Sequence, residues 1–536
     1  MTYLLSFLIA ILVSWGLIPS LVRYAPQLGM LDAPGERKMH STVIPRCGGI
    51  GIALGAICAT VALVPLSTVY FSLIIGGIII VLFGVADDIL DINYKWKFLG
   101  QTIAVCFVIS QGVYIKVVPF MGMNEAPLLV SYTLTFLFVI GSTNAVNLSD
   151  GLDGLAAGIM LLSFACIAVL GLFSGGLAVS IMAIAVIGGI IGFLRFNTYP
   201  AMVFMGDAGS QFIGFMAALL AITLTQHVST ALNPALPLLI MGLPILDTLS
   251  VMVQRVRVGR SPFSPDKRHI HHKLLTYGFT HEQSVVAIYI LQVVFLISAF
   301  LLKYSADWEV VGLYVLISSA LLVAFYLAGS KHWLLNTGDI SIDKRKNRLR
   351  RYQWIFPFCR NYIEYSIIIY LILLSLQLIF VIRPEWYLEL IFLLVALLIL
   401  KWVPNKAQGI LIRVGIYSSV LVGCYQLFNS SYLQELLLNA VDLFFILLLM
   451  VVTVAIRVTR KAYFKLTTQD VLVLLFVIAA LFVVEVEFVA RALFYLFCLG
   501  YALEYLFHRD AYMFRALRVL AFFCMLNFSV FLSIYS

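Results

Sequence analysis

The sequence predicts an all-α polytopic membrane protein, and its composition leads directly to that fold class. Hydrophobic residues make up 62% of the 536 residues and charged residues only 11%, whereas a soluble domain carries about 25% charged residues. The mean hydropathy is +1.03. A chain of this composition is expected to form many membrane-spanning helices rather than one water-soluble core.

Individual spans are expected where roughly 20 apolar residues follow one another, the length that crosses the hydrocarbon core of a bilayer. In the first section these stretches lie near residues 3–22, 48–66, 69–86, 98–115, 127–146, 155–173, 177–194, 205–225, 236–253, 284–302 and 310–329. The first stretch has no preceding basic segment and no small-residue cleavage pattern, so we expect a retained helix rather than a signal peptide. The first section is therefore predicted to be a core of about ten or eleven spans.

Basic residues fall on alternate loops, which predicts the orientation of the chain. Loops on one side carry only Lys116 and Lys303. The other side carries thirteen: Arg23, Arg37, Lys38, Arg46, Lys95, Lys97, Arg195, Arg255, Arg257, Arg260, Lys267, Arg268 and Lys273. Because Lys and Arg accumulate in cytoplasmic loops, the richer side is predicted to be cytoplasmic and the N-terminus to lie outside. The net charge of +9 is explained in this way, without nucleic-acid binding.

A second section is expected after a basic segment at residues 330–365, which we predict to be a cytoplasmic linker. About seven further spans follow, near residues 366–383, 387–402, 410–427, 436–456, 470–484, 488–505 and 518–534. The predicted organisation is a membrane core over 1–329, the linker, and a C-terminal transmembrane section over 366–536. No motif in the last section indicates its role.

The first polar cluster, Asp87, Asp88 and Asp91, lies at the end of the third predicted span. On a continuous helix Asp87 and Asp91 would share a face. Carboxylates this close repel one another unless a cation lies between them. A solvated helix end is the alternative, although a cytoplasmic end would favour Lys or Arg. The cluster therefore indicates a functional, cation-binding site.

A second cluster, NAVNLSDGLDG at residues 144–154, contains Asn147, Asp150 and Asp153. Its glycines would allow the backbone to approach a ligand closely. Capping of the next helix would explain one carboxylate, but not two carboxylates together with two asparagines. The segment is thus a candidate binding loop.

A third cluster, FMGDAGS at residues 204–210, places Asp207 between glycines at the start of the eighth predicted span. Mg²⁺ is usually held by one or two protein carboxylates together with phosphate oxygens and water. Asp207 is therefore a candidate Mg²⁺ ligand, with a simple N-cap as the alternative.

A fourth cluster combines His269, His271 and His272 with the neighbouring Asp266, Lys267 and Arg268. Histidine with Lys and Arg offers several charged donors to a phosphate group. Zinc is the rival interpretation, but no Cys accompanies the histidines, and nearby carboxylates suit Mg²⁺ better.

Four more residues are candidates from position alone. Lys38 and Arg46 precede paired glycines before the second span, a pattern that suits an anionic lipid head group. Lys97 opens the fourth span, where snorkelling to the interface is the alternative. Asp247 lies within the ninth predicted span and is either functional or a hydrogen-bonded structural group.

Five segments carry a family resemblance: RKMHSTVIPRCGG, DDILD, NAVNLSDGLDGLA, FMGDAGS and SPDKRHIHHKLLTYGFTHEQ. In this order they closely resemble the polyprenyl-phosphate N-acetylhexosamine-1-phosphate transferases, with the WecA/TagO branch nearest and MraY more distant. The HIHH pattern resembles the WecA-like branch more than the triple-histidine run of MurNAc-pentapeptide phosphotransferases, which are the disfavoured enzyme alternative.

This resemblance implies a ten- or eleven-span fold in the bacterial inner membrane with a cytoplasmic active site. It implies Mg²⁺, or Mn²⁺ in its place, as cofactor, a UDP-N-acetylhexosamine as donor and undecaprenyl phosphate as acceptor. We expect GlcNAc-1-phosphate transfer with release of UMP, which initiates a lipid-linked cell-envelope glycan. The lipid bilayer is an implied partner, and the sequence does not decide whether the protein forms a homo-oligomer. The family does not need the section after about residue 340.

The roles of individual residues are hypotheses from the chemistry, because donor and acceptor are both phosphates and the reaction is a phosphoryl transfer. Asp87 and Asp88 are the candidate catalytic residues, with Asp87 as base for the lipid phosphate, and Asp207 with Asp88 would hold Mg²⁺. The candidate substrate-binding residues are Lys97, His269, His271 and His272 for phosphates, Asn147, Asp150 and Asp153 for nucleotide or sugar, and Lys38 and Arg46. Direct transfer and a covalent aspartyl-phosphate route both stay open.

A transporter or flippase of lipid-linked sugars, without transferase activity, is the alternative from a different class. Transporters place binding groups near the bilayer midplane, often on broken helices. Here the polar clusters are predicted to gather at one membrane face, with Asp247 as the clear exception. The enzyme interpretation is therefore favoured.

Overall fold

The computed structural model describes most of the first part of the chain and short stretches of the second. The described residues are 2–32, 43–65, 67–122, 125–261, 268–330, 358–359, 361–370, 434–459, 491, 494–495, 498–499 and 502. The chain divides into one unit of residues 1–336 with 467–472 and another of residues 337–466 with 473–536. Most of the predicted linker and of the predicted C-terminal spans lies outside the described residues.

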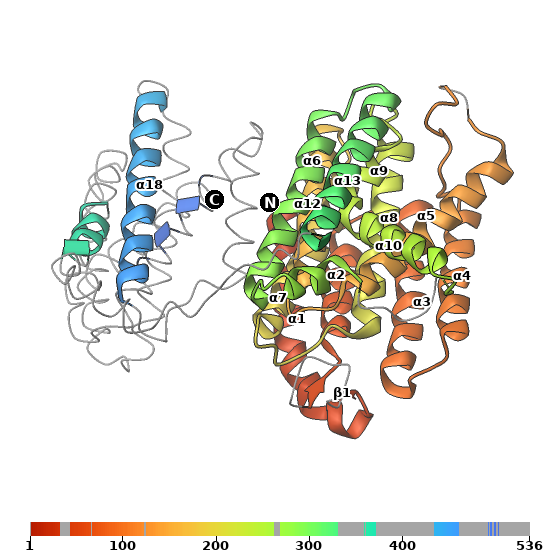
Figure 1. Ribbon diagram of the computed structural model, residues 1–536, viewed down its shortest axis with the longest axis horizontal. Helices are drawn as coiled ribbons and strands as arrows, with labels where there is room; N and C mark the ends of the chain where they lie inside the picture. Colours follow the sequence, from red (N-terminus) through yellow and green to blue (C-terminus); the bar gives the residue numbers. More distant parts are fainter. Residues whose placement is uncertain are drawn as a thin grey trace. The chain divides into compact units, whose positions relative to one another are not determined.

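Helices form nearly all of the described first unit (Figure 1). They are α1 (Thr2–Leu28), α2 (Gly48–Leu63), α3 (Thr68–Leu90), α4 (Tyr94–Ser110), α5 (Leu128–Ser149), α6 (Leu155–Phe173), α7 (Leu177–Asn197), α8 (Gly206–Thr223), the π-helical η1 (Leu224–Val228), α9 (Leu236–Ile240), α10 (Gly242–Arg257), α11 (Ile270–Thr276), α12 (His281–Leu301) and α13 (Asp307–Ser330). Strands β1 (Leu31–Asp32) and β2 (Ile44–Pro45) pair antiparallel. The second unit contains α18 (Gln434–Thr459). The all-α fold class is confirmed.

Eight helices among the described residues are long and apolar enough to cross a membrane. They coincide with eight of the stretches predicted in the first section. The other three predicted stretches correspond to the shorter helices α2 and α4 and to the pair α9 and α10. The chain is thus a multi-pass membrane protein, and its total number of crossings stays a prediction.

The prediction of one continuous span over residues 236–253 is wrong. The chain forms two helices, α9 and α10, which are separated at Met241. Pro237 and Pro244 lie in the first turns of these helices, where a proline removes no intrahelical hydrogen bond. Asp247 therefore lies near the start of α10 rather than midway along a long span.

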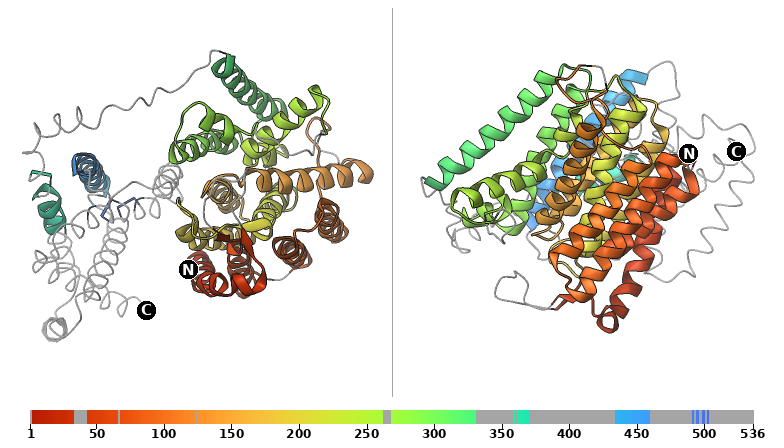
Figure 2. Two further views of the ribbon diagram at one scale, coloured as in Figure 1. Left: turned by 60° about the horizontal axis from the view of Figure 1, so that its bottom comes forward. Right: turned by 90° about the vertical axis from the view of Figure 1, so that its right-hand side faces the viewer.

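Helix α8 is the central element of the first unit. It contacts α3 and α5, and also α2 and α6, and its most apolar stretch is completely buried. A helix that is apolar on all sides must be surrounded by other elements. In the right-hand view of Figure 2 the helices coloured red to yellow run side by side. The start of α8, with its FMGDAGS segment, is consequently enclosed by helices that carry other predicted motifs.

Glycines allow α2 and α3 to approach the start of α8 closely. A Cβ on Gly49 would lie 2.1 Å from the backbone nitrogen of Gly209. A Cβ on Gly84 would lie 2.4 Å from the Cα of Ala208. The glycines before the second span, which the sequence associated with a lipid head group, thus serve helix packing. The contact through Gly84 brings the acidic end of α3 to α8.

Candidate active site

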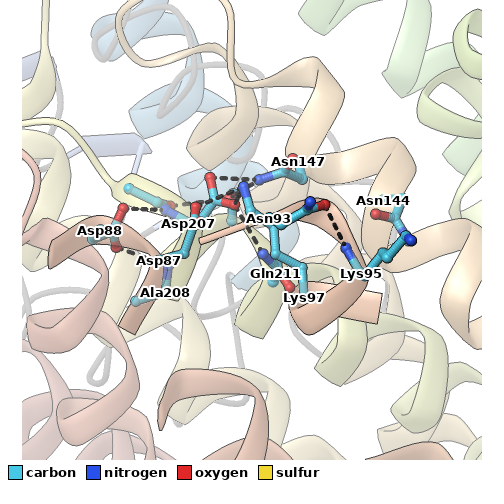
Figure 3. A network of polar contacts seen from close by, with 12 residues as sticks. Asp87, Asp88, Asn93, Lys95, Lys97, Asn144, Asn147, Asp207, Ala208 and Gln211 are labelled. Carbon is cyan, nitrogen blue, oxygen red and sulfur yellow. Dashed lines mark hydrogen bonds and ion pairs between the residues drawn. The ribbon is translucent and has the colours of Figure 1, made fainter. Parts of the chain in front are cut away.

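A lysine joins the acidic end of α3 to the start of α8 (Figure 3). The Nζ of Lys97, in the first turn of α4, lies 2.6 Å from Oδ2 of Asp87 and 2.8 Å from Oδ2 of Asp207. The Lys97 side chain is 29% exposed and that of Asp87 only 6%. Ion pairs so far removed from water are screened less than surface pairs. Three predicted spans therefore meet in one charged cluster.

Amide side chains hold the Asp207 carboxylate on its other sides. Asn147 Nδ2 donates to Oδ1 at 3.1 Å, and Gln211 Nε2 donates to Oδ2 at 3.0 Å. Gln101 Nε2 in turn donates to Gln211 Oε1 at 2.9 Å. Hydrogen bonds to a carboxylate are stronger than those between neutral groups, so this network fixes the direction of the side chain.

Asp88 points to the backbone of α8 instead of to Lys97 (Figure 3). Its Oδ1 accepts the N–H of Asp207 at 2.9 Å, and its Oδ2 accepts the N–H of Ala208 at 3.1 Å. The residue is 6% exposed. Adjacent aspartates on α3 therefore have different partners: a lysine for Asp87 and a helix start for Asp88.

One oxygen of Asp87 lacks a partner. Its Oδ1 is buried and accepts no hydrogen bond from the described residues, a costly arrangement for which a catalytic role or a bound ion is one explanation. The predicted pairing of Asp87 with Asp91 on one helix face is wrong. Helix α3 ends at Leu90, and Asp91 takes a left-handed conformation (φ 49°) with an exposed side chain.

Asp247 anchors the histidine-rich segment through both of its carboxylate oxygens. Its Oδ2 lies 2.9 Å from Nδ1 of His269, and its Oδ1 accepts the N–H of Ile270 at 2.9 Å. Both Asp247 and His269 are buried. A carboxylate on one ring nitrogen fixes the orientation of an imidazole. Asp247 thus holds the start of α11, which explains its burial.

His271 packs against the loop that follows α5. A Cβ on Gly151 would lie 2.3 Å from Nε2 of His271, and the His269 and His271 rings stack with centroids 5.8 Å apart. Burial, reinforced by the charge of His272, lowers the pKa of His271 to about 3. At neutral pH His271 therefore contributes a neutral hydrogen-bonding ring rather than a positive charge.

The loop between α5 and α6 carries the remaining acidic candidates. Asp153 Oδ2 accepts the N–H of Ala201 at 3.0 Å, and the Asp153 N–H donates to Nε2 of His281 at 3.1 Å. Asp150 is exposed and near enough to Asp207 for their charges to repel. Asp150 therefore lies beside the charged cluster, whereas Asp153 connects this loop to the one before α8.

The basic candidates near the N-terminus are only partly described. Arg46 forms an ion pair with buried Asp32 across the two-stranded ladder. Lys38 lies outside the described residues, as do Asp266 and Lys267 before α11. The role of these three residues in binding stays a prediction.

Direct contacts therefore unite five predicted site residues: Asp87, Asp88, Lys97, Asn147 and Asp207. Gln211 was not predicted from the sequence, although its position four residues after Asp207 on a helix places both side chains on one face. His281 was not predicted either, and its partner Asp153 lies 128 residues away along the chain.

Carboxylates outnumber cations in this cluster, which suits a hard divalent ion. Asp87 and Asp207 share one ammonium group, that of Lys97, and Asp88 is a third carboxylate near both of them. The buried, unpartnered Oδ1 of Asp87 adds spare acceptor capacity. Among the described residues no group of three or more His, Cys, Asp or Glu is arranged to hold a metal. Mg²⁺ needs only one or two carboxylates when phosphate oxygens and water complete its shell, so the residues fit it.

Comparison with known proteins gives a consistent picture. The model of glycosyl transferase family 4 matches residues 70–225, which contain the whole charged cluster. A Bacillus subtilis (strain 168) protein named "Probable undecaprenyl-phosphate N-acetylglucosaminyl 1-phosphate transferase" is 35% identical over 307 residues, 56% of this chain and 86% of that protein.

Two further relatives come from other bacteria. The undecaprenyl-phosphate alpha-N-acetylglucosaminyl 1-phosphate transferase of Escherichia coli (strain K12) is 32% identical over 343 residues, 61% of this chain and 90% of that protein. The decaprenyl-phosphate N-acetylglucosaminephosphotransferase of Mycobacterium leprae (strain TN) is 34% identical over 301 residues, 50% of this chain and 75% of that protein.

Proposed function

The chain belongs to glycosyl transferase family 4 as a member of the polyprenyl-phosphate N-acetylglucosamine-1-phosphate transferases, and from this premise we propose its reaction in detail. It transfers GlcNAc-1-phosphate from UDP-GlcNAc to undecaprenyl phosphate, depends on Mg²⁺, and starts a lipid-linked envelope glycan. The observation that carries this proposal is the convergence of Asp87 and Asp207 on Lys97, with one carboxylate oxygen unpartnered.

The proposed chemistry is phosphoryl transfer between two phosphates. An oxygen of the lipid phosphate forms a bond to the β-phosphorus of UDP-GlcNAc. The bond from this phosphorus to the oxygen that bridges to the α-phosphate breaks, and UMP leaves with that oxygen. The lipid then carries GlcNAc on a diphosphate. Because both reactants are anions, positioning and charge neutralisation contribute most of the catalysis.

Asp207 is the proposed protein ligand of Mg²⁺, together with oxygens of the donor diphosphate. Bound Mg²⁺ would offset the negative charge that develops on the leaving UMP. Asn147 and Gln211 hold the Asp207 side chain in place for this task. Asp88 was the second expected ligand, but both of its oxygens accept backbone N–H groups.

Lys97 and Asp87 are proposed to act on the lipid phosphate. Lys97 neutralises Asp87 and Asp207 in this structure and would contact the incoming phosphates. The unpartnered Oδ1 of Asp87 can accept a proton from a lipid phosphate that arrives as the monoanion. A phosphate monoester with a second pKa near 6 is largely a dianion at neutral pH, so this base assists only a minor fraction.

The site is proposed to face the cytoplasm of a bacterial inner membrane, with the N-terminus outside. The excess of Lys and Arg on one set of loops supports this orientation. The charged cluster lies at the end of α3 and at the starts of α4 and α8. A site at helix ends lets a polyprenyl chain stay in the bilayer while its phosphate meets a water-soluble donor.

The test is UMP release by the purified protein with undecaprenyl phosphate and UDP-GlcNAc, with and without Mg²⁺. We expect Mg²⁺-dependent release that Asp207→Ala reduces by about 10³-fold, because several kcal/mol of charge stabilisation is lost. Asp87→Asn is expected to reduce it severely as well. Wild-type protein that is folded and binds polyprenyl phosphate, yet releases no UMP from a panel of UDP-sugars, would contradict the proposal and favour lipid transport.

A further inference from the structure

Helix α8 begins without a local capping side chain. Its N-cap residue is Met205, which makes no side-chain hydrogen bond to the helix. The first N–H groups of a helix have no acceptor within the helix, and a Ser, Thr, Asp or Asn at the N-cap position usually supplies one. Methionine has only a weakly accepting sulfur. The first turn of α8 therefore needs an acceptor from elsewhere.

Asp88, on α3, supplies that acceptor from 119 residues away along the chain. Its two oxygens accept the N–H groups of Asp207 and Ala208, at 2.9 Å and 3.1 Å. These are the second and third residues of α8, the positions whose N–H groups a local N-cap side chain serves. A negative charge at this place is also stabilised by the positive end of the helix dipole. Figure 3 shows the carboxylate facing both N–H groups.

The neighbouring backbone is adapted to this contact. Gly206 has a φ of +72°, and a Cβ there would lie 2.6 Å from Oδ2 of Asp88. Any other residue at this position would be strained and would push the carboxylate away from the helix start. Gly84, one turn before Asp88 on α3, allows the two backbones to approach.

We propose that Asp88 is a positioning residue that caps α8 from another helix and thereby sets the backbone of Asp207. This assignment rests on the proposed function, in which Asp207 binds the cation. It differs from a shared Mg²⁺ ligand, because Asp88 directs its two oxygens at α8. Its neighbour Asp87 keeps an oxygen without a partner and faces Lys97.

Two substitutions at residue 88 separate capping from ligation. Asp88→Asn keeps the shape and one of the two accepting oxygens, but its amide nitrogen faces the other backbone N–H group, which loses its acceptor. Asp88→Ala removes both acceptors. We expect Asp88→Asn to retain about a tenth or more of the wild-type kcat for UMP release, and Asp88→Ala to lose at least about tenfold more. The Mg²⁺ concentration for half-maximal activity should stay within about threefold of wild type in Asp88→Asn. Asp87→Asn, the adjacent isosteric change, is the matched comparison.

Amide hydrogen exchange gives a second measurement that needs no activity. The peptide spanning residues 204–212 should exchange about tenfold faster in Asp88→Ala, since its first-turn N–H groups lose their acceptors, and near the wild-type rate in Asp87→Asn. This readout remains available if Asp88→Ala is poorly active or unstable.

The outcomes are distinguishable. A rise of tenfold or more in the Mg²⁺ requirement of Asp88→Asn, with wild-type exchange in residues 204–212, would overturn the capping role and indicate a metal ligand. Unchanged exchange in Asp88→Ala would also overturn it. A wild-type protein without UMP release would contradict the proposed function, and the exchange experiment would still support or overturn the cap.

Discussion

Helices α8 and α11 both begin against a carboxylate from another helix, yet the two starts are built differently. At α8, Asp88 gives both oxygens to backbone N–H groups. At α11, Asp247 gives one oxygen to the N–H of Ile270 and the other to the ring of His269. The first carboxylate fixes a backbone, and the second fixes a side chain as well.

The groups that each start carries differ in the same way. The start of α8 presents Asp207, which lies beside Lys97 and close to the unpartnered oxygen of Asp87. The start of α11 presents His271, whose imidazole is neutral at pH 7 and packs on Gly151. The start of α8, where a cation and phosphates would bind, therefore has negative charge and an oxygen without a hydrogen-bond partner. The start of α11 instead contributes a neutral ring that shapes the surface beside it.

The largest effect on activity is expected when the positive charge of Lys97 is removed from the start of α8. Lys97→Met keeps much of the side-chain length and leaves two partly buried carboxylates without their ammonium partner. Lys97 would also contact the incoming phosphates, and loss of one such donor removes about 3–4 kcal/mol of transition-state stabilisation, so we expect UMP release to fall by about 10²- to 10³-fold. Lys95→Met, at an exposed position on the same helix, is the control and should stay near wild type. Equal activity of both variants would contradict the central role of Lys97.

The second effect compares glycines at the two starts. In Gly49→Ala the new Cβ would lie 2.1 Å from the backbone nitrogen of Gly209, which cannot move aside. In Gly151→Ala it would lie 2.3 Å from the tip of the His271 ring, which can turn. We expect Gly49→Ala to lower the free energy of unfolding by about 1–3 kcal/mol, and Gly151→Ala to lower it less. Thermal unfolding in detergent measures both, and an equal loss would show that the two contacts are equally rigid.

The third effect concerns the ring that Asp247 holds. Asp247→Asn keeps an acceptor for the N–H of Ile270 but removes the charge beside His269. If the histidine segment contacts the donor phosphates, the KM for UDP-GlcNAc should rise by about tenfold, the value of one charge-assisted hydrogen bond. The KM for undecaprenyl phosphate should not change. Ser250→Ala, one turn further along α10, is the control, because Ser250 bonds only to the backbone oxygen of Asp247. An unaltered donor KM in Asp247→Asn would exclude this contribution.

A fourth effect, on the pH dependence of stability rather than on activity, follows from the pKa of His271. Its folded-state pKa of about 3 lies below the ordinary value of 6.5, so the unfolded chain binds a proton first as the pH falls. This residue's contribution to stability is therefore complete above pH 6.5 and declines as the pH falls from there toward 3. We expect wild type to lose up to about 2 kcal/mol more stability than His271→Gln between pH 7 and pH 5. Melting temperatures at the two pH values test this, and parallel losses would contradict a depressed pKa.

Most residues at the start of α8 were predicted from the sequence, but the contacts that hold this helix start in place were not. Isolated polar residues are conspicuous in an apolar chain, which identified Asp87, Lys97, Asn147 and Asp207. The alternation of basic and non-basic loops assigned all four to one face of the membrane. The capping role of Asp88 was not predictable, because it depends on Met205 being an inadequate cap and on a contact across 119 residues. Met205 can be read from the sequence, but neither the start of α8 at Gly206 nor the long-range contact has a local signal there.

The α11 start was predicted less well, for a related reason. A carboxylate within an apolar run was identified at Asp247, but a continuous ninth span was expected there. Prolines lie in the first turns of α9 and α10, on either side of the break at Met241. Two prolines also lie inside α1, which continues through both, so a proline alone does not predict a break. The fold class follows from composition, whereas the breaks that orient a side chain follow from tertiary packing.

The most direct test of the account follows the phosphorus atom itself. Purified protein is incubated with undecaprenyl phosphate, Mg²⁺ and UDP-GlcNAc labelled at the β-phosphate, and the lipid and aqueous phases are separated. We expect the label to move into the lipid phase with wild type and with Lys95→Met, and to stay in the nucleotide with Asp207→Ala or without Mg²⁺. Label that stays in the nucleotide with folded, lipid-binding wild type, or that moves equally with Asp207→Ala, would contradict it.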